Sequence, residues 1–209
     1  MRLPNTAHTS RPWRIHEIAP DFELEDVWAL PTPGGAGDFP RLVRQIAASD
    51  PSRSFPGAAR ALWELRDNVG DLLGWDNPDT GIGSGAPTLQ DRLPADLHDA
   101  PSGPHFDALP ATPLYLTGDE FAAEGANQTV HGVMHLSWVP DGSGGHRGQL
   151  AVLVKPNGLF GRTYMAAIKP FRYLIVYPAL LRMIRREWRD GTPRDVLLAA
   201  RHPTDQGGR

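Results

Sequence analysis

The segment NGLFGRTYMAAIKPFRYLIVYPALLRMIRREW, residues 157–188, decides how the fold is interpreted. Its apolar residues predict the longest helix of the chain, over about residues 160–190. Pro170 and Pro178 each remove a backbone hydrogen bond, which predicts kinks in this helix. Residues 173–181 carry no charge, but at about 1.5 Å per residue they cannot cross a hydrocarbon layer about 30 Å thick. The segment therefore predicts a long, kinked and buried helix rather than a membrane span.

The residues before this helix have the pattern of β-strands. Three stretches alternate or carry β-forming residues, and turn residues such as PDGSGG join them: PLYLTGDEFAAEGAN (113–127), TVHGVMHLSWV (129–139) and RGQLAVLVKP (147–156). Strands so close in sequence pair antiparallel. We therefore expect an antiparallel sheet directly before the long helix.

The N-terminal half is predicted to hold one strand, two short helices and a long loop. RPWRIHEI (11–18) alternates as a strand that opens the sheet. Asp38 begins the first helix, which buries Leu42, Val43 and Ile46. The second helix, within residues 57–74, has an apolar stripe formed by Ala58, Leu62, Leu65, Val69 and Leu72. Residues 75–112 form a Pro/Gly-rich loop with one helical turn at TLQDRLPADL.

Length and composition indicate a single domain with two tails. The chain has 209 residues, 40% of them apolar, which suffices for one core. We expect a disordered leader over 1–11, the domain over 12–190 and a C-terminal tail over 191–209. The leader has no apolar run typical of a signal peptide, which favours a cytoplasmic protein. The net charge of −3 argues against binding of nucleic acid or anionic membranes, and without cysteine the chain has no disulfide or thiolate site.

Two histidines of NQTVHGVMHLSW (127–138) are the candidates for acid–base chemistry. His131 and His135 share the polar face of the predicted strand. If only the apolar face is covered, both point to water; if the polar face lines a cavity, either is a general base. Glu124 is in the same way either a solvent-facing carboxylate or a cavity acid. No metal is expected, because positions i and i+4 of a strand lie roughly 13 Å apart.

The long helix also supplies the candidates for ligand binding. Its aromatic and methionine side chains belong mostly to the core, and if a cavity exists some of them line it. The predicted ligand-binding residues are Tyr164, Met165, Ile168, Phe171, Tyr173 and Tyr177, together with Trp138 of the preceding sheet.

The order of these elements resembles the helix-grip architecture of the START and pathogenesis-related-protein superfamily. LWELRDNVGDLLGW, LQDRLP, NQTVHGVMHLSWV and residues 157–188 look like a bacterial domain-of-unknown-function family, number 2867, over about residues 12–188. The resemblance implies an α+β domain in which an antiparallel sheet wraps around the long C-terminal helix, with two short helices after the first strand. Some relatives carry this domain behind an NAD(P)-binding Rossmann domain. No G-x-G-x-x-G follows a strand here, so no nucleotide cofactor is expected.

Three functions are compatible with these features. The first is binding of an apolar small molecule or lipid in a cavity between the sheet and the C-terminal helix. The second is a cyclase-like or dehydratase-like enzyme that uses Glu124, His131 or His135 in the same cavity. The third is an interaction module for a separate Rossmann-type protein. The sequence has no recognisable nucleophile with its base and no phosphate loop, which argues against the second function.

Overall fold

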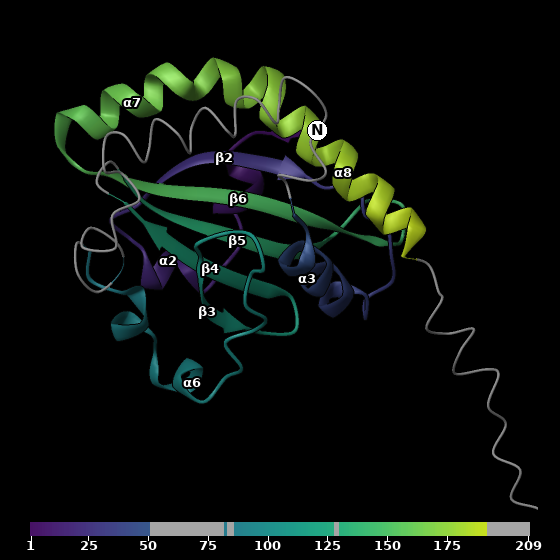
Figure 1. Cartoon of the computed structure of the whole chain (residues 1–209). Coiled ribbons are helices and arrows are strands. Elements are labelled where there is room, and N and C mark those ends of the chain that lie inside the picture. The colour runs from purple at the N-terminus through teal and green to yellow at the C-terminus, as the bar shows by residue number, and fades with distance from the viewer. Residues whose placement is uncertain (51–81, 83–85, 128–129, 192–209) are drawn as a thin grey trace, which may run out of the picture.

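The computed structural model describes residues 1–50, 82, 86–127 and 130–191. A six-stranded antiparallel open sheet forms the centre, in the strand order β1-β2-β6-β5-β4-β3 (Figure 1). The strands are β1 (Arg2–Leu3), β2 (Glu23–Ala29), β3 (Thr112–Leu116), β4 (Glu120–Ala126), β5 (Val130–Pro140) and β6 (His146–Pro156). The antiparallel strands predicted over 113–156 are confirmed.

Helices cover both faces of this sheet (Figure 1). One face, here called the helix face, carries α3 (Phe39–Ala48), α7 (Gly158–Phe171), the π-helical turn η3 (Arg172–Val176) and α8 (Tyr177–Asp190). The other, here called the cover face, carries α1 (Thr6–Thr9), α2 (Ile15–Ile18), η2 (Leu89–Arg92) and α6 (Ala95–His98). The protein is thus a mixed α+β protein with an open antiparallel sheet and a long C-terminal helix.

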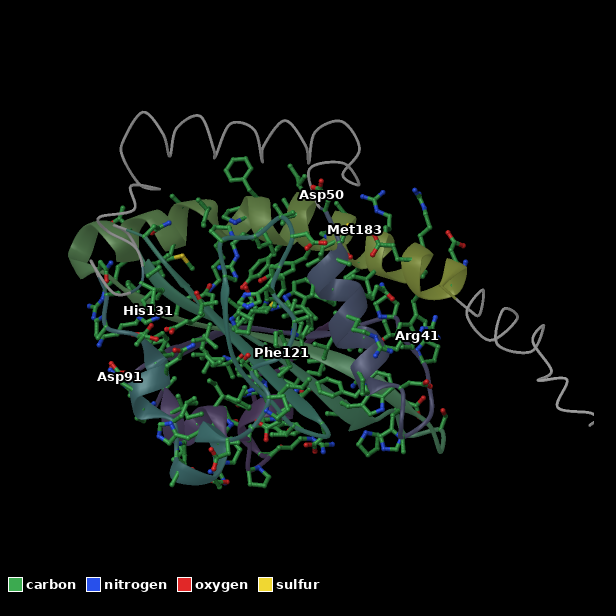
Figure 2. All side chains as sticks on the ribbon, turned by 60° about the horizontal axis from the view of Figure 1, so that its bottom comes forward. Arg41, Asp50, Asp91, Phe121, His131 and Met183 are labelled. Carbon is green, nitrogen blue, oxygen red and sulfur yellow. The ribbon has the colours of Figure 1, made fainter. Side chains whose placement is uncertain are left out.

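Each face has its own apolar core. On the helix face, Phe121, Leu136 and Trp138 pack with side chains of α3 and α8, and Figure 2 shows Phe121 near the middle of the molecule. On the cover face, Val133, Ala151 and Leu153 pack with the N-terminal segment and η2. A sheet that is buried on both faces has no polar side left to face water.

The prediction of a strand at residues 11–18 is wrong. Ile15–Ile18 form the short helix α2, which buries Ile15 and Ile18 on one side. The physical cause is a distant carboxylate, because Glu120 accepts the backbone N–H of Arg14 at 3.0 and 3.2 Å and so holds the start of this helix. The sheet instead gains β2, whose acidic sequence ELEDVWA carries little strand signal.

The first eleven residues, expected to form a disordered leader, form β1 and α1 instead. Arg2 and Leu3 pair with Trp28 and Val27 of β2, and His8 is fully buried. Backbone pairing and burial tie this segment down, which a local reading of polar residues does not reveal.

The other predicted helices have mixed outcomes. The helix that begins after Asp38 is confirmed as α3, with Leu42, Val43 and Ile46 buried. The helical turn at TLQDRLPADL is confirmed as η2 followed by α6. The helix predicted within residues 57–74 lies outside the described residues. The domain limits at residues 12 and 190 stay predictions.

Close packing at Gly148 predicts a stability effect. A Cβ added there would lie 2.6 Å from Leu42 Cδ2 and 3.0 Å from both Leu30 Cδ1 and Thr32 Oγ1. We expect Gly148→Ala to lower the free energy of unfolding by about 1–3 kcal/mol through overpacking. Gly132→Ala in the neighbouring strand is the control and is expected to be neutral or stabilising by about 0.5–1 kcal/mol. Urea titration of both variants measures the difference, and equal stabilities would contradict it.

Candidate functional site

The two histidines of β5 lie on the cover face and are buried. His131 is 5% exposed and His135 is 0% exposed. The expectation that they point to water is therefore wrong, because the N-terminal segment and η2 cover the face that a one-sided sheet would leave wet. Figure 2 shows His131 inside the fold, at the end of the molecule where Asp91 of η2 lies.

His131 and Glu124 form a buried pair across β4 and β5. His131 Nε2 lies 2.8 Å from Glu124 Oε2, and Glu124 is 0% exposed. The same carboxylate accepts the Thr88 hydroxyl at 2.5 Å and the Leu89 N–H at 3.0 and 3.1 Å. Glu124 thus caps the start of η2 and attaches it to the sheet, since an ionised carboxylate satisfies several donors at once.

His135 belongs to a second buried chain of hydrogen bonds. Glu120 Oε2 lies 3.1 Å from His135 Nε2 and 3.1 Å from the Tyr115 hydroxyl. Glu120 accepts the Nε2–H of His135. The Nδ1 of His135 therefore carries no proton and accepts a hydrogen bond from His8 Nε2, 3.0 Å away. Burial, followed by the neighbouring His135 and His16, lowers the pKa of His8 to about 3. Burial also lowers the pKa of His135 against the opposing effect of Glu120.

These two networks hold the covering segments on the sheet. Glu124, His131 and His135 do not line the space between the sheet and the C-terminal helix, where the enzyme hypothesis placed them, because all three belong to the opposite face. No three His, Asp or Glu side chains among the described residues are arranged to hold a metal ion. The hydrogen bonds of the two networks fix the tautomer of His135 and attach α1, α2 and η2 to the sheet.

The helix face contains a different kind of surface beneath α7. A row of residues crosses the sheet there, from Asp26 to Val152, Met134 and Ala123 on β2, β6, β5 and β4. Val152 and Met134 are only half-buried, although they lie in the two central strands. With strands about 4.8 Å apart, Asp26 lies roughly 10 Å from Met134 along this row. On the helix face these two apolar side chains are thus less completely covered than Leu136 and Leu150 of the same strands, which are buried.

Two glycines remove side chains from the same surface. Gly125 of β4 and Gly132 of β5 are paired in register on the helix face. Within 4 Å of a Cβ built at Gly132, the described atoms are only the Gly125 and Leu153 carbonyl oxygens, at 3.8 and 3.9 Å. At Gly125 the Pro110 carbonyl oxygen approaches to 3.0 Å. Gly125 thus admits the Pro110 loop, while a Cβ at Gly132 would make only ordinary van der Waals contacts with described atoms.

A charged cluster lies at the β2 end of this surface. Asp26 is 0% exposed and accepts hydrogen bonds from Arg172 Nη2 and, at 2.9 Å, from the Tyr177 hydroxyl. Arg172 Nη2 also lies 2.7 Å from the Tyr177 hydroxyl. Glu25, at the irregularity of β2 between Leu24 and Asp26, pairs with Lys169 at 3.0 Å. The cluster joins the edge of the sheet to the middle of the C-terminal helix.

The π-helical turn places the two helical members of this cluster together. η3 runs from Arg172 to Val176 between the two predicted kink sites, and its wider turn brings Arg172 and Tyr177, five residues apart, to one side. Pro178 cannot donate to the carbonyl of Leu174, which favours the irregular turn before it. Helix α7 continues through Pro170. An interruption of the long helix is therefore found, as a π-turn between the prolines.

Aromatic rings cover the cluster. Tyr177 stacks on Trp28 with ring centroids 4.3 Å apart, and the Arg2 guanidinium lies 4.6 Å from the Tyr173 ring centroid. Burial and Asp26 raise the pKa of the Tyr173 hydroxyl, so it keeps its proton near neutral pH. Burial is also the main cause of the raised pKa of Tyr177. Both hydroxyls are therefore hydrogen-bond donors in this environment.

The predicted ligand-binding residues divide into those near this surface and those away from it. Met165 and Tyr177 are buried, and Ile168 and Tyr173 are half-buried. Phe171 is 52% exposed.

The remaining two predicted residues are Trp138 and Tyr164. Trp138 is buried against α3 and α8 and donates its Nε1–H to Gly35 O at 3.0 Å. The side chain of Tyr164 is outside the described part. The sequence analysis does not find Asp26 and Trp28, because it does not predict β2, nor Arg172, because its ion pair needs Asp26.

The fold defines the class of protein, and the comparison with known proteins gives its family. The fold is a mixed α+β domain with an antiparallel sheet and a long C-terminal helix. A family model described as "Protein of unknown function (DUF2867)" matches residues 18–179, and the chain belongs to this family. No curated protein and no solved structure matches the chain. Among the described residues, no helix is both long and apolar enough to pass through a membrane.

Proposed function

We propose that the protein binds an apolar small molecule or lipid between the sheet and the C-terminal helix. The observation that carries the proposal is the half-buried row of Val152 and Met134 beside the glycine pair, ending at the buried Asp26 cluster. Binding sites for small molecules are concave, mostly apolar and supplied with a few polar anchors. Arg172 and Tyr177 would provide such anchors at one end.

A helix-grip arrangement is part of this proposal. In it, the helix face of the sheet forms the floor and α7 forms the opposite wall. Met165 and Ile168, three residues apart on α7, would face the floor, since helical positions i and i+3 share a side. The ligand would lie along the row from Met134 toward Asp26, within a protein that we propose to be cytoplasmic.

Filling the space at Gly132 tests the proposal. A leucine there would project into the open region above the floor and exclude the ligand. We expect the wild type to bind the neutral dye N-phenyl-naphthylamine with a saturable increase in fluorescence, and Gly132→Leu to lose this binding while it stays folded by circular dichroism.

Gly118→Leu is the matched control. A Cβ at Gly118 would meet no described atom within 4 Å, and this turn lies between β3 and β4, away from α7. Dye binding should stay at the wild-type level in this variant. Equal binding by wild type and Gly132→Leu would contradict the proposed position of the ligand.

A second candidate function is the interaction module, favoured by two exposed apolar side chains. Phe171 is 52% exposed and Leu174 is 77% exposed, three residues apart on the outer side of the C-terminal helix. Exposed apolar residues that lie together favour a protein contact. Phe171→Ser with Leu174→Ser is expected to leave dye binding unchanged, because both side chains point away from the floor. A loss of dye binding in this folded variant would place the ligand on the outer side instead.

A further inference from the structure

Three polar atoms beside the proposed site lack a hydrogen-bond partner among the described residues. They are Asp26 Oδ1, Arg172 Nη1 and the Tyr173 hydroxyl, and all three are shielded from solvent. Arg172 Nη1 lies 3.8 Å from Glu25 Oε1, which is too long for a hydrogen bond. Buried polar atoms without partners are rare in folded proteins and need an explanation.

These atoms have complementary requirements. Asp26 Oδ1 belongs to an ion-paired carboxylate and only accepts hydrogen bonds, so its partner must donate. Arg172 Nη1 only donates, so its partner must accept. The Tyr173 hydroxyl, protonated near neutral pH, is a further donor that lies close to Asp26. One group that donates and accepts at the same time satisfies Asp26 and Arg172 together.

We infer that the ligand is an apolar alcohol whose hydroxyl group donates to Asp26 Oδ1 and accepts from Arg172 Nη1. This inference rests on the proposed binding function. A carboxylate has no proton to give to Asp26 and is repelled by its charge. An ammonium group has no lone pair for Arg172 and is repelled by the guanidinium. The hydrocarbon part of the alcohol extends from Asp26 along Val152 and Met134 toward Gly132.

Displacement of the neutral dye by three probes of equal chain length tests the inference. Decanol, decanoate and decylamine are titrated into the dye-loaded full chain at pH 7.5. Decanol is expected to displace the dye at a concentration about tenfold or more lower than either charged probe, since one lost charge-assisted hydrogen bond is worth about that factor. Equal displacement by all three, or preference for decanoate or decylamine, overturns the inference and leaves apolar binding intact. A dye that does not bind, or that none of the probes displaces, overturns the binding function itself.

Asp26→Asn gives a second and independent measurement. The amide removes the negative charge, so the discrimination against decanoate is expected to shrink at least threefold while decanol still binds. Asp96→Asn is the matched control, because Asp96 lies on α6 at the cover face and its side chain is 63% exposed. An unchanged preference in a folded Asp26→Asn protein would overturn the role of Asp26. If this variant does not fold, the wild-type order of the three probes still decides the inference.

Discussion

Replacing Arg172 with alanine is expected to lower the free energy of unfolding by about 3–5 kcal/mol. Asp26 is 0% exposed, and its charge is balanced by Arg172, whose side chain is 13% exposed. Removing the guanidinium leaves a buried carboxylate beside two neutral tyrosine hydroxyls, those of Tyr177 and Tyr173. An uncompensated charge in a buried position costs far more than the loss of an exposed ion pair. Urea unfolding followed by tryptophan fluorescence measures the change.

Two further variants show whether the buried charge is the cause. Lys169→Ala breaks the ion pair with Glu25. The Lys169 side chain is 43% exposed, so we expect this variant to lose less than about 1 kcal/mol of the free energy of unfolding. Adding Asp26→Asn to Arg172→Ala removes the unpaired charge and is expected to recover part of the lost stability. A loss below about 1 kcal/mol in Arg172→Ala, or a further loss in the double variant, would show that the cluster does not anchor the helix.

Acid is expected to destabilise the protein strongly through His8. The pKa of His8 is lowered from 6.5 to about 3 by burial and by the neighbouring His135 and His16. Between these two pH values His8 binds a proton in the unfolded chain but not in the folded chain. The free energy of unfolding therefore falls as the pH falls below about 6.5, and the contribution of neutral His8 is fully present above that pH. At about 1.4 kcal/mol per pH unit, His8 alone lowers the free energy of unfolding by about 3 kcal/mol at pH 4.5 relative to neutral pH.

His8→Gln separates this effect from the titration of the carboxylates. The glutamine amide can still donate to His135 Nδ1 but does not titrate. The variant is expected to be less stable than wild type at pH 7.5, and this difference should shrink or reverse at pH 4.5. Urea midpoints at the two pH values measure it. A difference that stays constant across this range would mean that His8 is not kept neutral by the fold.

The sequence predicts those helices and strands whose pattern is clear within a short stretch of residues. The strands between residues 113 and 156 have clear alternation and short turns, and the C-terminal helix has a continuous apolar content. Helix α3 follows from its buried stripe, whereas Asp38 makes no capping hydrogen bond and accepts the Gly35 N–H instead. Each of these elements has a pattern that neighbouring residues determine.

The elements that failed depend on distant residues. Residues 11–18 alternate as a strand does, yet α2 forms because Glu120 binds the N–H of Arg14. The first eleven residues are ordered because β2 pairs with β1 and because His8 is hydrogen-bonded to His135, which is 127 residues away in the sequence. No window of local sequence contains both partners of such contacts.

The candidate site was predicted in part for the same reason. Tyr173 and Tyr177 were found from the composition of the long helix, and the structure places both beside Asp26. Asp26 itself lies in β2, a strand that is not predicted because its acidic sequence has little strand signal. His131, His135 and Glu124 are polar candidates in the sequence, but the structure places them in two separate hydrogen-bond networks, and the face they occupy depends on which segments cover the sheet.

The measurement that tests the central claim most directly is NMR of the protein with methyl-labelled methionine, titrated with decanol. The chain has four methionines: Met134 lies on the proposed floor and Met165 on the buried side of α7, whereas Met183 packs in the core near α8 and Met1 is exposed. Our account predicts saturable shifts of the Met134 and Met165 signals, with Met183 and Met1 unchanged. Shifts confined to Met183 or Met1, or no saturable shift at all, would contradict binding between α7 and the sheet.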